Sequence, residues 1–511
     1  MKKAKAFLLN GALLAASTLL LRFIGVAFNA YLTRSLGEAG MGLLTLTLSV
    51  YSFALTFSTS GINLASTRLC SEAAGRCSSD EMKRALRLCF LYALFFGAIG
   101  EVSLFALAPV IARNALEDMR TVFSIRVLAL SLLPIALSSA LSGYFNAVRR
   151  VWCNSLNMVL SQAARIASTV AFLYFLAPFG ISYACCAVVA GITVSEIFSL
   201  AVSFILFLLS KKGYGDQNAP EGLFRRLIDI SLPVAFAAYA RSGLVTIEHI
   251  LIPRGLKKNG ASAAEALASY GTVHAMALPI VLFPSAVLSA FASLLVPELS
   301  EALACGQKKR VKYISAKVLR ATALFSIGAS SVLAAFGQGL GEAIYSSADA
   351  GKYIRLFAVL VPVMYFDTSV DAMLKGIGEQ VYSMKVNILD AALSVILVWA
   401  LVPKLGVGGY IIMVFVTEVL NMLLSVKKLV ERTHVRINVF SFFILPLICS
   451  AGAAGAAYLI LPTLFSRSSQ GGALFCCVGA VFTLCLYIGF LLLSGALKRA
   501  DIRYFKKVLA K

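Results

Sequence analysis

Long apolar stretches separated by short polar gaps make up almost the whole chain. About fourteen such stretches follow one another, and each is long enough to cross a bilayer. Lipid allows only helices or closed barrels to cross it, and runs of about twenty apolar residues without period-two alternation favour helices. The sequence predicts an all-α polytopic membrane protein with helices at residues 7–32, 41–65, 86–112, 121–148, 151–176, 181–209, 227–252, 266–297, 311–337, 352–375, 382–403, 408–427, 439–462 and 471–495.

Basic residues are distributed unevenly between the two sets of gaps. Of the 46 lysines and arginines, 32 fall in gaps on one side of the predicted membrane and 9 on the other. This bias is the positive-inside pattern, and an even number of spans puts both termini in the cytoplasm. The net charge of +22 therefore indicates contact with anionic lipid in the cell membrane and not a nucleic-acid site.

The polar gaps are too short to hold a soluble domain. The longest are residues 66–85 and 210–226, and the longest outer loop, residues 253–265, contains a single acid. A membrane enzyme such as a polyprenyl-sugar transferase needs catalytic carboxylates or histidines in a sizeable outer loop, so the pattern disfavours an enzyme. The eleven cysteines form no C-x-x-C motif, and His249, His274 and His434 are too dispersed to predict a metal site, so no cofactor is expected.

The cytoplasmic gap at residues 211–220 is the best boundary between two lobes. The first predicted helix carries Arg22 and Asn29 seven residues apart, and the seventh carries Arg241 and Glu248 with the same spacing. A spacing repeated in this way is typical of parallel repeats in transporters. We predict a first lobe (1–210), a linker (211–226), a second lobe (227–432), and two further helices with a basic tail (433–511).

Three arginines lie at similar depth within the first seven helices. Arg22 is about fifteen residues from the cytoplasmic start of its helix, or roughly 22 Å, and Arg165 and Arg241 are similarly central. A central charge costs about 2.5–3.5 kcal/mol, so it requires a partner or a watery cavity. Guanidinium groups match phosphate oxygens, which predicts an anion cavity. For Arg165, pairing with Glu196 of the sixth helix is the simpler alternative.

The second lobe carries acids instead. Asp367, Asp371 and Lys375 are spaced four residues apart, so that Asp371 and Lys375 can pair on one helix face. Asp390 and Glu418 add two acids in the cytoplasmic half of the same lobe. One interpretation is a site for a coupling ion or proton. The other, which the sequence favours, is a structural ion-pair network that includes a salt bridge from Asp367 to Lys385.

Several motifs resemble the stage V sporulation protein B-like family of polysaccharide and oligosaccharide flippases, within the MATE-like (MOP) superfamily. They are Ser58-Thr59-Ser60-Gly61-Ile62, Met276-Ala277-Leu278-Pro279, Phe283-Pro284-Ser285, Leu295-Val296-Pro297-Glu298 and, most specific, the long segment 362–384 containing Lys375-Gly376-Ile377-Gly378-Glu379. The resemblance covers essentially the whole chain. It implies twelve to fourteen helices in two lobes around a central cavity, and movement of an undecaprenyl-pyrophosphate-linked sugar, such as a peptidoglycan precursor for the spore cortex.

The sequence is more distantly similar to lipid II flippases of the MurJ type. Their first-helix pattern is matched here by Arg22 and Gly25, whereas Phe28-Asn29 replaces an Arg-Asp pair. In the eighth helix, Pro279 and Leu282 replace an Arg and a Glu.

These features together predict a flippase that works by alternating access. Arg22, Asn29, Arg241 and Glu248 are the predicted substrate contacts, and the expected partners are the lipid-linked oligosaccharide, membrane lipids and, as candidates, cell-wall synthesis enzymes. A MATE-type drug or cation exporter is one alternative, although it would require an acidic cavity. A non-transporting scaffold of cell-wall assembly is another.

Overall fold

The computed structural model describes residues 2–59, 61–76, 79–209, 222–435, 440–464 and 472–495. Every regular element in these ranges is helical, which confirms the predicted all-α class. Most of the predicted linker and the basic tail from residue 496 lie outside the described residues. The elements are α1 (Lys2–Thr59), α2 (Ile62–Gly75), α3 (Ser79–Val110), η1 (Ile111–Leu116), α4 (Thr121–Ala129), α5 (Leu132–Ala147), α6 (Val151–Leu176), η2 (Ala177–Phe179), α7 (Ile181–Leu209), α8 (Leu223–Lys258), α9 (Ala263–Gly271), η3 (Thr272–Ala277), α10 (Leu278–Leu282), α11 (Ser285–Ala304), α12 (Lys308–Tyr345), α13 (Ala348–Ala358), α14 (Val361–Gly376), α15 (Gln380–Leu405), α16 (Val407–Thr433), η4 (Phe440–Ile444), α17 (Leu445–Leu464) and α18 (Ala473–Leu493).

The predicted count of fourteen spans is not confirmed. Among the described residues, 12 helices are long and apolar enough to cross a membrane, or 13 if α13 and α14, bent by 61° at their junction, count as one span. The first candidate contains two predicted spans, because α1 runs through 58 residues with a break in helical geometry at Gly37 (φ 69°, ψ 177°). At 1.5 Å per residue, α1 would be roughly 87 Å long, which far exceeds a bilayer core. Gly37 therefore separates two helical parts.

The region predicted as a single span at 266–297 is also interrupted. It comprises α9, the π-helical η3, the short α10 and then α11, whose N-cap is Pro284. Proline ends a helical hydrogen-bond ladder because it has no N–H and its ring clashes with the preceding turn. The interruption places the backbone carbonyl of Leu282 beside α1, where the side chain of Arg22 donates a hydrogen bond to it.

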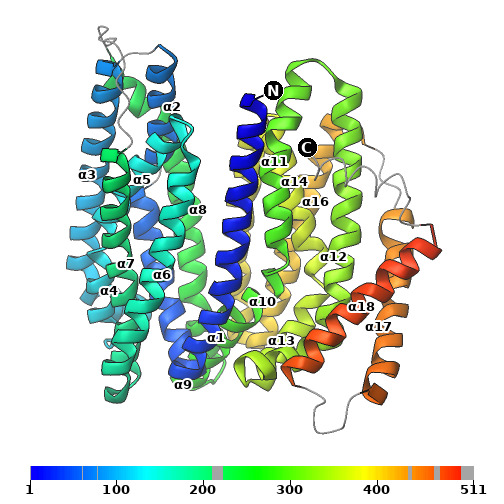
Figure 1. The fold of residues 1–511 in the computed structure, drawn as a ribbon. Coiled ribbons are helices and arrows are strands. Elements are labelled where there is room, and N and C mark those ends of the chain that lie inside the picture. The colour runs from blue at the N-terminus through cyan, green and yellow to red at the C-terminus, as the bar shows by residue number, and fades with distance from the viewer. Residues whose placement is uncertain are drawn as a thin grey trace.

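The helices form two groups around α1 (Figure 1). Helices α2 to α7 form one group with α8 beside it, and α11 to α14 with α16 to α18 form the other, next to the first part of α1. We call the end of the bundle at which α1 begins the near end, and the end at which α9 and α13 lie the far end (Figure 1).

Two helices contact the group opposite to the lobe predicted for them. The near part of α1 binds α10 and α11 through Arg22. The near part of α8 packs on α2, where Gly61 (φ +80°) approaches the backbone of Ser231 so closely that a Cβ there would lie 2.6 Å from the Ser231 carbonyl oxygen. Tyr239 of α8 also donates a hydrogen bond to the carbonyl oxygen of Phe57 at 3.1 Å. These contacts join the two predicted lobes through α1 and α8, the two helices that carry polar residues seven positions apart.

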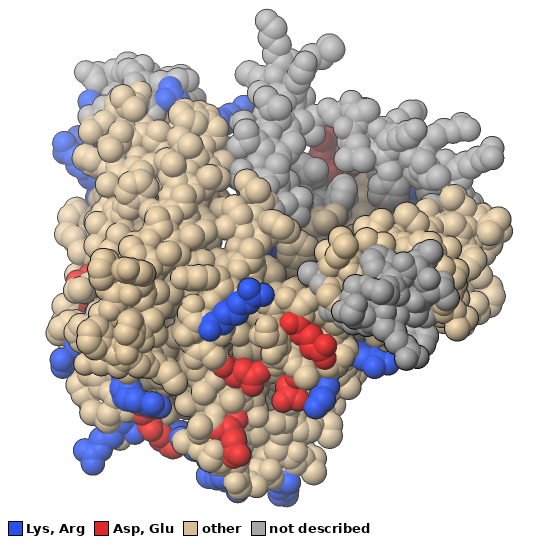
Figure 2. Space-filling view, turned by 60° about the horizontal axis from the view of Figure 1, so that its bottom comes forward, with Lys and Arg blue, Asp and Glu red and all other residues tan. Residues whose placement is uncertain are grey.

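Glycines allow α1 and α9 to meet at the far end. A Cβ on Gly42 would lie 1.9 Å from the carbonyl oxygen of Leu267, and one on Gly271 would lie 2.5 Å from the backbone nitrogen of Gly42. Both helices are therefore in backbone contact, at a distance that only glycine permits. Figure 2 shows the far end, where basic and acidic side chains lie next to one another.

Candidate functional site

A cavity of about 570 Å³ lies between α1, α6, η3 and α10. Its apolar lining includes Phe28, Leu32 and Leu278. Its polar lining consists of Arg22, Asn29, Gln162, Arg165 and His274. The cavity is therefore cationic, with no carboxylate among its lining residues. Its size is within the range of ordinary ligand pockets.

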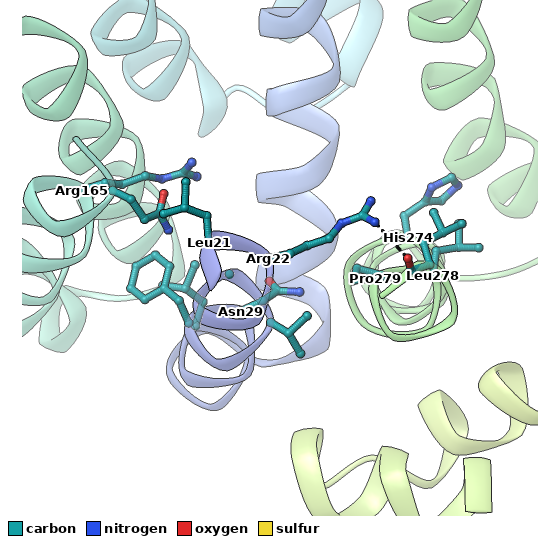
Figure 3. A pocket seen from close by; sticks show the side chains of 13 residues that line it. Leu21, Arg22, Asn29, Arg165, His274, Leu278 and Pro279 are labelled. Carbon is teal, nitrogen blue, oxygen red and sulfur yellow. Dashed lines mark hydrogen bonds between the residues drawn. The ribbon is translucent and has the colours of Figure 1, made fainter. Parts of the chain in front are cut away.

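Arg22 joins α1 to the interrupted helix on the other side of the cavity. One guanidinium nitrogen donates to the carbonyl oxygen of Leu282 and to Oγ of Ser285, each at 3.1 Å. A guanidinium carries five N–H donors, so this anchoring leaves further donors directed at the cavity. In Figure 3 the Arg22 side chain extends from α1 toward the helix that carries Leu278 and Pro279.

Asn29 lies about two turns further along α1 and also bridges to the opposite group. Its side-chain amide donates to the carbonyl oxygen of Ala275 in η3 and to the hydroxyl of Tyr345. The carbonyl oxygen of the Asn29 side chain accepts no hydrogen bond from the described residues, and Asn29 is part of the cavity lining. Arg22 and Asn29 thus hold α1 against α10 and η3 at two positions about two turns apart.

Arg165 lines the cavity from α6 and extends toward Leu21 of α1 (Figure 3). It interacts electrostatically with Glu196 of α7 and with Tyr51 of α1. The described residues show no Arg165–Glu196 ion pair within 4.0 Å, and the Nε–H of Arg165 is buried without a hydrogen-bond acceptor. The guanidinium is therefore held near Glu196 but is not neutralised by direct contact.

Arg241 and Glu248 are not among the lining residues of this cavity. Both belong to α8, and Arg241, which is exposed, interacts electrostatically with Asp367 of α14 and Asp390 of α15. Glu248 and Asp390 are like charges and repel each other. The structure thus groups the two α8 residues with the acids of the second lobe, and it groups Arg165 with Arg22.

The acids of the second lobe differ in how they are paired. Lys375 binds Asp371 with 2.6 Å between Nζ and Oδ2, and the hydroxyl of Ser383 donates to the same carboxylate. Asp367 forms no ion pair or hydrogen bond with the described residues, and the expected bridge to Lys385 is not formed. Glu418 of α16 interacts electrostatically with Asp367, Asp390 and Glu248. The result is a cluster of carboxylates from four helices (Glu248, Asp367, Asp390 and Glu418), and Arg241 interacts electrostatically with Asp367 and Asp390.

Sequence reasoning missed Gln162 and His274 as lining residues. Gln162 is one turn before Arg165 on α6, so the same helix face would have indicated it. For His274 no local signal existed, because its position depends on the π-helical turn of η3. No group of three or more His, Cys, Asp or Glu that could hold a metal is present in the described part of the chain.

Comparisons with known proteins agree with this fold. Residues 7–303 match the family described as "Polysaccharide biosynthesis protein". Stage V sporulation protein B of Bacillus subtilis (strain 168) is 25% identical over 446 residues, covering 85% of this chain and 86% of that protein.

Two solved structures are similar over most of their length. A lipid II flippase MurJ in an inward closed conformation aligns with a TM-score of 0.66, 14% identity and 99% coverage of both chains. An inward-facing multidrug resistance MATE family transporter of the MOP superfamily aligns with a TM-score of 0.63 and 15% identity, covering 82% of this chain and 98% of that one. The resemblance inferred from the sequence motifs is therefore confirmed, and the chain is a multi-span membrane protein with a MurJ- and MATE-like fold.

Proposed function

We propose that this chain, which belongs to the polysaccharide biosynthesis protein family, moves a polyprenyl-pyrophosphate-linked saccharide across the cytoplasmic membrane by alternating access. The cargo class is a peptidoglycan precursor or a related oligosaccharide of the cell wall or spore cortex. Two names suggest this class: that of a sequence relative, a sporulation protein, and that of a solved structure with a similar fold, a lipid II flippase. In this proposal both termini face the cytoplasm, as the charge bias of the gaps predicts.

The observation that carries the proposal is the cationic cavity beside α1. Arg22 and Arg165 line it and no carboxylate does, so it favours an anionic group over a cation. Pyrophosphate oxygens would accept from the free donors of Arg22 and from Arg165. The amide groups of Asn29 and Gln162 suit the hydroxyl groups of a sugar, and the polyprenyl tail would stay in lipid.

Arg241 and Glu248 remain proposed substrate contacts at a second position. Arg241 is exposed at mid-helix of α8, and the near part of α8 packs on α2 of the other predicted lobe. Its acidic neighbours Asp367 and Asp390 would hold it until a phosphate competes for it. An anion would then meet Arg22 and Arg165 first and Arg241 when the lobes rearrange.

Reconstitution in vesicles tests the proposal. We expect wild-type protein to flip a fluorescent polyprenyl-pyrophosphate disaccharide, and Arg22→Ala to abolish flipping while the protein still inserts and folds. Arg22→Lys should slow flipping about 10- to 100-fold, because an ammonium cannot reproduce hydrogen bonds to a charged group worth about 1.5–3 kcal/mol.

Arg126→Lys is the matched control. Arg126 is also a guanidinium within an apolar stretch, but it lies over the ring of Phe105 at 5.2 Å, away from the cavity. Its replacement by another cation should leave flipping near the wild-type rate. Wild-type flipping in Arg22→Ala would reject the anion-binding role.

The two alternatives give different results in the same vesicles. A drug or cation exporter would move a cationic dye and leave the lipid-linked saccharide in place. A non-transporting scaffold would move neither. The acid-free lining of the cavity argues against the exporter.

A further inference from the structure

Two of the three histidines, far apart in sequence, meet in a buried polar cluster. His249 of α8 and His274 of η3 have ring centroids 4.7 Å apart. Nδ1 of His249 is 2.8 Å from the hydroxyl of Tyr270, and Nε2 of His274 is 2.9 Å from the hydroxyl of Tyr410. We call these four residues the His–Tyr cluster. It joins α8, the α9–η3 segment and α16 through two hydrogen bonds and a contact between the imidazole rings.

Charged and polar groups approach the His–Tyr cluster from each neighbouring helix. Glu248 of α8 interacts electrostatically with both tyrosines, and Glu418 of α16 with Tyr410. From α15, Asp390 interacts with Glu248 and Glu418. Beside the cavity, α1 contributes Arg22 and Asn29, and α12 contributes Tyr345. Helix α13 carries Asp349, Lys352 and Arg355. Asp349 and Lys352 form an ion pair with each other at 2.8 Å.

The His–Tyr cluster connects the cavity with the carboxylates Glu248 and Glu418. His274 lines the 570 Å³ cavity and also a small internal space of about 10 Å³ shared with Tyr270 and Tyr410. Both tyrosines are almost fully buried, at 1% and 3% exposure, whereas both histidines are half-buried. Because His274 lines the cavity, a proton from cavity water can reach its imidazole. Glu248 and Glu418 interact electrostatically with Tyr410 of the same cluster.

Two adjacent imidazoles bind one proton far more readily than two. A second positive charge a few ångströms away in a poorly hydrated site opposes the first, as for any pair of like charges. Histidine ordinarily titrates within physiological pH, but burial disfavours its charged form. The carboxylates of Glu248 and Glu418, which act on the tyrosines of the cluster, favour the charged form and offset part of that cost. We propose that His249 and His274 form a site for a single shared proton. This site links the cavity to the carboxylates of Glu248, Asp367, Asp390 and Glu418, and the shared proton is the coupling ion.

Protonation changes the hydrogen bonds that hold the three helices together. A neutral imidazole offers one donor and one acceptor, whereas an imidazolium has two donors and no acceptor. When the shared proton arrives, the tyrosine oxygen at that nitrogen must accept, and its hydroxyl hydrogen turns to another acceptor. Glu248 and Glu418 are the carboxylates that interact electrostatically with Tyr410. Proton arrival would thus alter the junction of α8, η3 and α16. The coupling role rests on the proposed function, but the proton site itself does not require any particular cargo.

The histidine content permits a direct test by NMR. The full chain, labelled with ¹³C at histidine Cε1 and held in lipid nanodiscs, gives three signals, and exposed His434 at the end of α16 provides an internal reference. Between pH 8 and pH 5 we expect the His249 and His274 signals to move at one common midpoint, each by about half of the full shift. In His249→Gln and in His274→Gln, the remaining histidine should show the full shift.

Two results would overturn the site. If neither signal moves between pH 8 and pH 5, the cluster is a fixed hydrogen-bonded support; if both show full shifts at separate midpoints, the histidines bind protons independently. A failed fold in one single variant leaves the other variant and the wild-type titration to decide.

Coupling is tested separately in vesicles with an imposed pH gradient. The gradient should drive the fluorescent lipid-linked saccharide beyond its equilibrium distribution in wild type and in His434→Gln but not in His249→Gln. An unchanged response in His249→Gln would overturn the coupling role. If wild type flips nothing, the proposed function fails while the NMR titration still decides on the proton site.

Discussion

An ion-pair latch at the far end should hold the two predicted lobes together. Glu117, at the end of η1 in the first predicted lobe, forms an ion pair with Arg254 at 3.1 Å and accepts a hydrogen bond from Lys257 at 3.0 Å, both in α8. Arg254 also donates to the carbonyl oxygen of Asn114. The neighbouring Asp118 is already engaged: burial raises its pKa, but hydrogen bonds from Arg120 outweigh burial and lower it. Glu117 is therefore the carboxylate that bridges to α8.

The strength of this latch follows from its exposure. The side chains of Glu117, Arg254 and Lys257 are 43%, 31% and 27% exposed, so each pair is worth about 0–1 kcal/mol. We take about 1 kcal/mol for the two pairs together, which is about fivefold in the ratio of open to closed molecules. Glu117→Gln should shift that ratio about fivefold toward opening, and Glu117→Arg, which adds repulsion, should shift it further.

Electron–electron distance measurements can report this shift. Spin labels on Met119→Cys and Lys258→Cys, both exposed positions, would flank the latch in a chain whose eleven native cysteines are replaced. We expect Glu117→Gln or 1 M salt to increase the population at longer distances, since screening weakens exposed pairs. Asp349→Asn is the matched control, because its partner Lys352 is in the same helix. An unchanged distance distribution in Glu117→Arg would refute the latch.

Three further predictions concern the acids, the topology and the packing. Because Asp367 joins no ion pair in the described structure, Asp367→Asn should fold with an unchanged melting temperature but respond less to an ion gradient in vesicles; a lowered yield with normal gradient response would favour a structural role. The charge bias predicts that a cysteine at Asn259 is labelled from outside intact cells and one at Gly215 is not, and the reverse pattern would contradict the topology. Gly42→Ala places a Cβ against the α9 backbone and should cost about 1–3 kcal/mol, seen as a lower melting temperature, whereas Gly408→Ala meets open space and should not.

Helix positions were predictable because the bilayer imposes one pattern on every span. Apolar runs identified the helices α3 to α8, and the interruptions were harder to see. Gly37 lies in a region that looked like an ordinary polar gap, yet helical structure continues on both sides of it. The interruption between α10 and α11 depends on Pro284, and prolines are ordinary in membrane helices, so their presence alone did not predict it.

The candidate site was only partly predictable, because depth in the membrane does not give direction. Arg22, Arg165 and Arg241 have a similar predicted depth, but which two line one cavity depends on how α1, α6 and α8 rotate and pack. The meeting of His249 and His274 likewise requires the π-helical turn of η3 and the packing of α8 beside it. Spacing in a single sequence does not contain that information.

The central claim is that the arginines of the cavity recognise a pyrophosphate-linked saccharide. The most direct measurement compares flipping of two fluorescent lipids in the same vesicles, with identical polyprenyl chain and sugar but with a pyrophosphate or a monophosphate between them. The account predicts faster flipping of the pyrophosphate lipid by wild type, and loss of this preference in Arg165→Gln. Equal rates for the two lipids, or flipping of neither, would contradict it.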